Sequence, residues 1–180
     1  MPTPRERNVN VVAVIGLALG AVFGMAGTFV HDPALRSLFW GIDGAGLVTA
    51  ASLLTLKYFQ KGCIFVAAGF MVFALGQALI LSGAAESLSA SVPSFGAGTA
   101  LWSIALLMVS VPNEFAAWVR VVGLISFALF LVTALSIFLG AQILSISKPL
   151  PYFAYPFLVL TFIGWIWTFL RENRITPSAV

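Results

Sequence analysis

One carboxylate stands inside an apolar stretch of this sequence, and it is the first residue that can carry chemistry. Asp43 lies in the segment WGIDGAG at 40–46. A helix that begins near Pro33 places Asp43 about 15 Å along its axis, at a rise of about 1.5 Å per residue. Ionisable side chains at that depth in a membrane helix usually face the bundle interior or a watery cavity. We therefore expect Asp43 to point inward, either as a ligand or proton site or as a polar contact between two helices.

Three further side chains join Asp43 in the candidate ligand or proton site. Gln77 lies five residues before Ser82, near the end of a later apolar segment, and its amide is a plausible partner for the carboxylate. Buried amides are also a common contact between membrane helices. Arg36 lies seven residues before Asp43, two turns along the same helix face, so its long side chain can lean toward the carboxylate. Trp40, one turn before Asp43, completes the set.

A glycine pattern occupies the first apolar segment. Gly16, Gly20 and Gly24 are spaced by four residues, so they fall along one face of a helix. Small residues at this spacing let two helix backbones approach closely in a membrane. The pattern predicts a close helix contact, and it leaves open whether the partner is another helix of this chain or a second protomer.

The sequence lacks the residue sets of the common catalytic and metal sites. It contains one histidine, His31, and one cysteine, Cys63, so it has neither a Cys-x-x-Cys pair nor a cluster of metal ligands. It also lacks the GxSxG, Walker and HExxH motifs and the dinucleotide-binding fingerprint. We therefore expect no metal and no cofactor, name no catalytic residue, and favour a non-enzymatic protein without excluding an enzyme.

The elements that must position these residues are membrane helices. Of the 180 residues 61% are hydrophobic and 8% charged, whereas soluble domains contain about 25% charged residues. About 20 apolar residues span the hydrocarbon layer. We predict an all-α integral membrane protein, one polytopic domain over 1–180 that forms a bundle of six transmembrane helices. The expected spans are 9–30, 33–56, 63–82, 92–111, 116–140 and 152–170.

The distribution of basic residues predicts the orientation. Lys and Arg are enriched on the cytoplasmic side of membrane proteins. With the N-terminus inside, seven basic residues fall on that side and two, Arg36 and Lys148, fall opposite. We therefore expect a multi-pass protein of the plasma (inner) membrane with both termini cytoplasmic. The basic residues form no stripe, so we expect no nucleic-acid partner. The cytoplasmic set is Arg5, Arg7, Lys57, Lys61, Arg120, Arg171 and Arg174.

These observations leave three classes of function. The favoured class is a non-enzymatic protein that binds a lipid-like or small hydrophobic ligand, or that serves as an accessory subunit of a membrane complex. The alternative is a small oligomeric transporter or channel with Asp43 and Gln77 on the path. A membrane-embedded lipid enzyme is the third class. Expected partners are the bilayer, a lipid-like ligand, and further copies of the chain or a larger complex. A faint repeat of Gly-Ala-Gly at 44–46 and 96–98 is left open.

Overall fold

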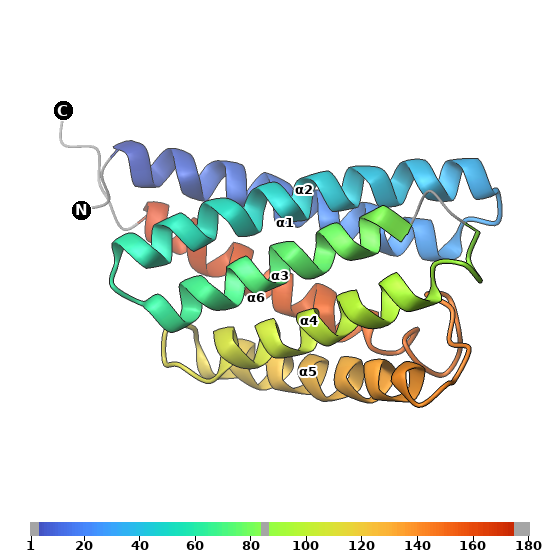
Figure 1. Cartoon of the computed structure of the whole chain (residues 1–180). Coiled ribbons are helices and arrows are strands. Elements are labelled where there is room, and N and C mark those ends of the chain that lie inside the picture. The colour runs from blue at the N-terminus through green and yellow to red at the C-terminus, as the bar shows by residue number, and fades with distance from the viewer. Residues whose placement is uncertain (1–3, 84–86, 175–180) are drawn as a thin grey trace.

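The computed structural model describes residues 4–83 and 87–174, and these residues form six α-helices joined by short connections (Figure 1). Each predicted span overlaps one helix, and no bound differs by more than five residues. The all-helical prediction is therefore confirmed. The helices are α1 (Pro4–Phe29), α2 (Pro33–Gln60), α3 (Ile64–Gly83), α4 (Val92–Ser110), α5 (Ala117–Phe138) and α6 (Tyr155–Arg174).

Among the described residues, five helices, α1 to α5, are long and apolar enough to cross a membrane. An isolated segment in lipid must satisfy its backbone hydrogen bonds internally, which only a helix allows. The sixth predicted span, α6, does not meet the same criterion of length and composition. It has 20 residues, but its last turn contains Arg171 and Glu172 and its first contains Pro156.

Local signals explain where the helices begin and end. The carboxylate of Asp32 accepts a hydrogen bond of 2.8 Å from the backbone N–H of Leu35, and Pro33 opens α2, as expected for a helix N-terminus. Pro156 is the second residue of α6, so it sets the start of the helix and interrupts no backbone hydrogen bond. After α2, Gly62 has a φ of +77°, which glycine adopts without strain.

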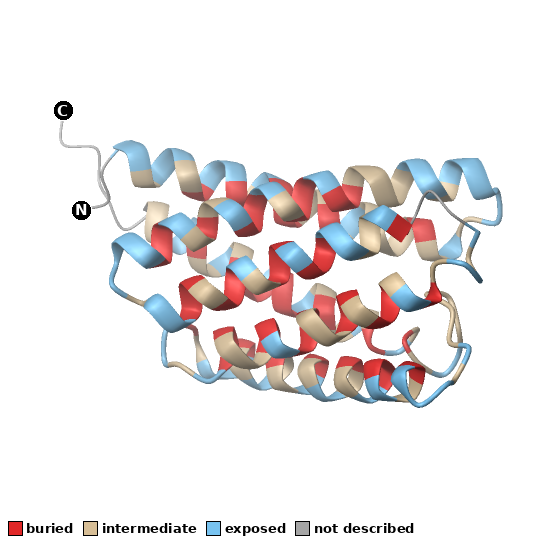
Figure 2. Cartoon of the chain, in the orientation of Figure 1, coloured by how far each residue is buried: buried red, intermediate tan, exposed pale blue. Residues whose placement is uncertain are grey.

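The helices form a closed circle in which each packs against the next along the chain and α6 returns to α1. The start of α1 and the end of α6 lie at the same end of the bundle (Figure 1). Buried residues line the faces that the helices turn toward one another (Figure 2). Aromatic side chains fill most of this interior: Tyr58, Phe70, Phe73, Trp102, Phe115, Phe130, Phe162, Trp165 and Phe169.

The glycine face of α1 packs against α2 of the same chain. A Cβ on Gly16 would lie 2.4 Å from the carbonyl oxygen of Gly46, and one on Gly20 would lie 2.3 Å from Leu47. A second crossing of this kind joins α3 to α4, where a Cβ on Gly76 would lie 2.9 Å from the carbonyl oxygen of Gly98. The predicted close contact is therefore internal, and Gly16, Gly20 and Gly24 are covered by α2 and not available to a second protomer.

Candidate functional site

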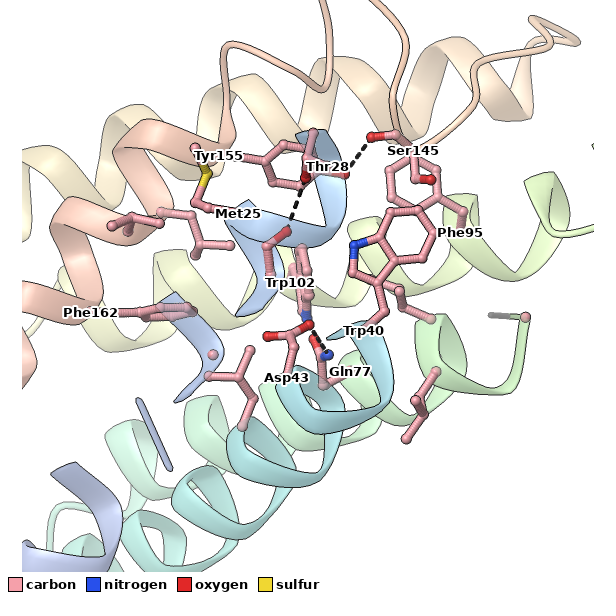
Figure 3. A pocket seen from close by; sticks show the side chains of 18 of the residues that line it. Met25, Thr28, Trp40, Asp43, Gln77, Phe95, Trp102, Ser145, Tyr155 and Phe162 are labelled. Carbon is pink, nitrogen blue, oxygen red and sulfur yellow. Dashed lines mark hydrogen bonds between the residues drawn. The ribbon is translucent and has the colours of Figure 1, made fainter. Parts of the chain in front are cut away.

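A cavity of about 70 Å³ lies inside the bundle, toward the end at which α2 begins. Four helices, α1 to α4, surround it together with α6 and the irregular segment 139–154. Its walls are mostly apolar and aromatic, with a few polar side chains among them (Figure 3). The cavity is lined by Gly20, Gly24, Met25, Thr28, Trp40, Asp43, Leu47, Gln77, Ile80, Leu81, Gly83, Ser91, Phe95, Trp102, Ser145, Tyr155, Leu158, Val159 and Phe162.

Asp43 and Gln77 meet at the wall of this cavity. Asp43 is 8% exposed, and its Oδ2 accepts a hydrogen bond of 3.1 Å from Nε2 of Gln77 on α3. On the opposite side, a Cβ on Gly24 would lie 3.2 Å from Oδ1 of Asp43, so the glycine leaves room for the carboxylate between α1 and α2. The expected inward orientation of Asp43 and its pairing with Gln77 are confirmed. Their role toward a ligand or proton stays a prediction.

Three buried side-chain polar atoms lack a hydrogen-bond partner in the described part of the chain, and all three belong to residues that line this cavity. They are Oε1 of Gln77, Nε1 of Trp102 and Oγ of Ser145. A buried polar atom without a partner costs about 1–3 kcal/mol, and such atoms are rare in native proteins. Their convergence on one cavity distinguishes this region from the rest of the described interior.

Close packing fixes the aromatic walls. The indole of Trp102 stacks on Phe73, with ring centroids 5.6 Å apart and planes 6° apart. Its edge also packs on the backbone of α3, because a Cβ on Gly76 would lie 3.0 Å from Trp102. On the other side, Trp40 lies against Gly27 of α1, where a Cβ would come within 2.5 Å of the indole. Both tryptophans are therefore held rigidly beside Asp43 and Gln77 (Figure 3).

The irregular segment 139–154 forms one wall of the cavity, and the sequence analysis did not predict this. The hydroxyl of Tyr155, the first residue of α6, donates a hydrogen bond of 2.8 Å to the carbonyl oxygen of Ser145. Within the segment, the backbone N–H of Leu144 bonds to Oγ of Ser147. These bonds hold the segment against the bundle, so that Ser145 lines the cavity. Neither Ser145 nor Tyr155 was among the candidate residues, because an irregular segment has no periodicity from which to place them.

Arg36 does not join this group. Its guanidinium turns back to α1, where Nη2 and Nε lie 2.7 and 3.2 Å from the carbonyl oxygen of Val30. A helix leaves its last carbonyl groups without partners, so Arg36 satisfies the end of α1 and does not lean toward Asp43 as expected. Its contact with the site is indirect, through Trp40, whose ring centroid lies 5.9 Å from the guanidinium carbon.

A second polar cluster, which the sequence interpretation missed, lies at the opposite end of the bundle. Nζ of Lys57 on α2 lies 2.5 Å from Oε2 of Glu172 on α6 and 2.7 Å from Oδ1 of Asn10 on α1. The amide of Asn10 donates in turn to Glu172 and to Asn173. The predicted span ended at residue 56, before Lys57, but α2 continues to Gln60 and Lys57 is buried.

The cavity offers hydrogen-bonding groups and aromatic surfaces. Among the described residues, no group of three or more His, Cys, Asp or Glu side chains is placed to hold a metal ion. Several buried hydroxyls donate to carbonyl groups of their own helix, as Thr99 does to Phe95 and Thr133 to Leu129. Asp43 carries the one carboxyl group among the described residues that line the cavity. The arrangement offers a carboxylate, free donors and acceptors, and aromatic surfaces to a small molecule.

Comparison of the chain with known protein families, with curated proteins and with solved structures gives no match.

Proposed function

We propose that this chain is a multi-pass protein of the plasma (inner) membrane that binds a small, largely hydrophobic ligand in the cavity beside Asp43, without transforming it chemically. The observation that carries this proposal is the convergence of three unpartnered buried polar atoms on one apolar cavity. Binding sites for small molecules are typically apolar pockets with a few well-placed polar groups. A ligand that hydrogen-bonds to these atoms recovers the free energy lost by burying them.

The outer surface of the bundle supports membrane insertion. Large apolar side chains are exposed along all of the helices, including Ile15, Val22, Leu75, Val132 and Leu160, each at least 44% exposed. An aqueous protein rarely leaves so many large apolar side chains uncovered around its whole circumference. Lipid tails, in contrast, solvate such a surface. All six helices, α6 included, then lie across the bilayer, with α6 contributing mainly to the interior.

The orientation with both termini in the cytoplasm rests on the distribution of basic residues. Lys57, Lys61 and Arg120 all lie at the end of the bundle where α1 begins and α6 ends. Arg36 and Lys148 lie at the other end. In this orientation the cavity is in the half of the bundle toward the non-cytoplasmic face, and the paired cluster around Lys57 lies toward the cytoplasm.

The interior of the bundle favours a one-sided binding site over a transport path. Phe73 and Phe162 lie beside the cavity with ring centroids 5.8 Å apart, and Trp165 contacts both of them. Tyr58 and Phe70 continue this packing toward the other end, with stacked rings 5.5 Å apart. A channel or transporter would have to separate these rings to connect Asp43 with the cytoplasmic side.

Native mass spectrometry of the protein extracted gently from its own membrane tests the proposal. We expect a co-purifying small molecule on the wild-type chain. The variant Val159→Phe fills the cavity and should lose that molecule, because Val159 lines the cavity. The matched control Leu160→Phe changes the next residue, which is exposed on the outer surface, and should retain it.

Two results would contradict ligand binding. One is a wild-type protein that carries no small molecule from its own membrane. The other is equal retention in the wild type, Val159→Phe and Leu160→Phe. A stoichiometric protein partner in the same spectra would instead support an accessory subunit of a membrane complex.

A further inference from the structure

The charge of the cavity restricts the ligand further. Among the described residues that line the cavity, Asp43 is the one carboxylic acid, and none is Lys, Arg or His. The nearest basic side chains on the same side of the bundle are occupied elsewhere. Arg36 bonds to Val30, and Nζ of Lys148 lies 4.6 Å from the ring centroid of Tyr152. An anionic ligand would therefore meet a carboxylate with no cation to offset it.

Of the three unpartnered polar atoms that line the cavity, Oε1 of Gln77 is an acceptor, Nε1 of Trp102 is a donor, and Oγ of Ser145 can be either. Nε2 of Gln77 donates to Oδ2 of Asp43, so the amide turns its Oε1 away from that bond, and Oε1 has no partner although Gln77 is 1% exposed. Oδ1 of Asp43 faces Gly24, which has no side chain to cover it. Oδ1 of Asp43 on α2 and Oε1 of Gln77 on α3 can therefore both accept hydrogen bonds from one donor group that carries at least two hydrogen atoms.

The aromatic walls add attraction for a cation. Trp40 lies one turn before Asp43 on α2, and Trp102 packs against Gly76, the residue before Gln77. Both indoles therefore flank the two acceptors (Figure 3). The face of a Trp side chain attracts ammonium groups, more strongly when water is excluded. One face of Trp102 is already stacked on Phe73, so Trp40 is the main source of this attraction. A carboxylate between two indoles is a favourable environment for a protonated amine.

We infer that the ligand of this cavity carries a primary amino group, which binds as an ammonium ion between Asp43 and Gln77 with its hydrocarbon part against Phe95, Tyr155 and Phe162. This inference rests on the proposed binding function and assigns its ligand to a chemical class, a hydrophobic primary amine. The ammonium donates to Oδ1 of Asp43 and Oε1 of Gln77. The cavity volume of about 70 Å³ accommodates the amino end of such a molecule more readily than a bulky head group.

A matched series of three six-carbon probes tests the inference. Hexylamine, hexanol and hexanoate differ only in the head group, and their binding is measured by thermal unfolding of the protein in lipid nanodiscs. We expect hexylamine to bind the wild type about tenfold more tightly than hexanol, because charge-assisted hydrogen bonds are stronger than neutral ones, and hexanoate to bind weakest. The variant Asp43→Asn keeps the size and one acceptor oxygen, and should lose the preference for hexylamine while retaining hexanol.

The outcomes separate this inference from the proposal on which it rests. Equal binding of hexylamine and hexanol to the wild type, unchanged in Asp43→Asn and abolished in Val159→Phe, would overturn the amine and leave the binding site intact. Tighter binding of hexanoate would also overturn it. If none of the three probes distinguishes the wild type from Val159→Phe, the cavity binds no such molecule and both proposals fail.

Discussion

The two buried polar clusters of this bundle differ in how completely they are paired. Around Lys57, three helices supply matched donors and acceptors, and the Lys57 side chain, 3% exposed, bonds to both Asn10 and Glu172. Around Asp43, a single side-chain hydrogen bond joins the carboxylate to Gln77, and three neighbouring polar atoms have no partner. Buried polar groups usually find partners within the protein. Both clusters are buried, and incomplete pairing is what distinguishes the one at which we propose a binding site.

Breaking the paired cluster should have the largest effect. Glu172→Ala leaves the ammonium of Lys57 buried with Asn10 as its remaining partner. We expect a loss of about 2–3 kcal/mol in the free energy of unfolding, somewhat below the usual range of about 3–5 kcal/mol because Glu172 is 32% exposed. Unfolding by SDS titration in mixed micelles measures this loss.

The double variant Lys57→Met with Glu172→Leu is the control for that experiment. It leaves no charge unpaired, and its remaining cost is the lost bond from Lys57 to Asn10, about 1 kcal/mol. It should therefore be more stable than Glu172→Ala. Equal loss in the single and double variants would mean that packing, and not pairing, stabilises this end of the bundle.

The helix crossing between the two clusters should give the next largest effect. Gly16 lies on α1 between Asn10 and Gly24, and a Cβ there would lie 2.4 Å from a backbone atom of α2. We expect Gly16→Ala to reduce the free energy of unfolding by about 2 kcal/mol, as other overpacking substitutions do. Separation of α1 from α2 should disturb both clusters, so ligand retention should fall as well.

Gly41→Ala provides the matched comparison, because nothing lies within 4 Å of a Cβ at Gly41. Alanine favours a helix over glycine by about 1 kcal/mol, so this variant should be as stable as the wild type or more stable. If both substitutions have the same effect, the close contact at Gly16 does not support the bundle.

The smallest effect on stability should come from the incompletely paired cluster. The double variant Asp43→Leu with Gln77→Leu removes the carboxylate and one unpartnered oxygen. Because replacing buried polar groups by apolar ones of similar size is often neutral or stabilising, we expect its free energy of unfolding to equal that of the wild type or to exceed it by about 1 kcal/mol. Ligand retention in native mass spectra should be lost.

A marked loss of stability in this double variant would count against the distinction between the clusters. It would show that Asp43 and Gln77 hold α2 and α3 together as firmly as Lys57 and Glu172 hold α2 and α6. The single variant Gln77→Leu checks the pair itself. It leaves the carboxylate without its donor, so it should be less stable than the double variant.

The sequence predicted the helices well because apolar length is a local property. Asp32 and Pro33 mark the start of α2 without knowledge of any neighbour. The span predicted from residue 152 placed Pro156 inside the sixth helix, whereas α6 begins at Tyr155. The meeting of Asp43 with Gln77 was also predictable, since both side chains fall at similar depth on consecutive helices. The depth of a residue along a helix follows from the number of residues between it and the helix end, at a rise of about 1.5 Å per residue.

The burial of Lys57 and the position of Ser145 could not be predicted in this way. The residues that follow Lys57 have the composition of an exposed turn. Its burial depends on Glu172, which is 115 residues away in the chain. Ser145 is placed by the fold of the segment 139–154, which follows no helical period. Arg36 was assigned to the wrong partner because sequence spacing gives its helix face but not the free carbonyl of Val30. Each of these errors concerns a contact between elements.

The place of α6, which closes the circle of helices, has a consequence for the order in which the protein assembles. The chain emerges from the ribosome N-terminus first, so α6 is the last of the six helices to be synthesised. It supplies Trp165 to the rings of Phe70 and Phe73, and Glu172 to Lys57. Until α6 is made, the inner faces of α1 to α5 and one buried ammonium therefore lack these partners. Assembly of the interior waits for the end of translation, and a chain interrupted before Tyr155 would have an incomplete core.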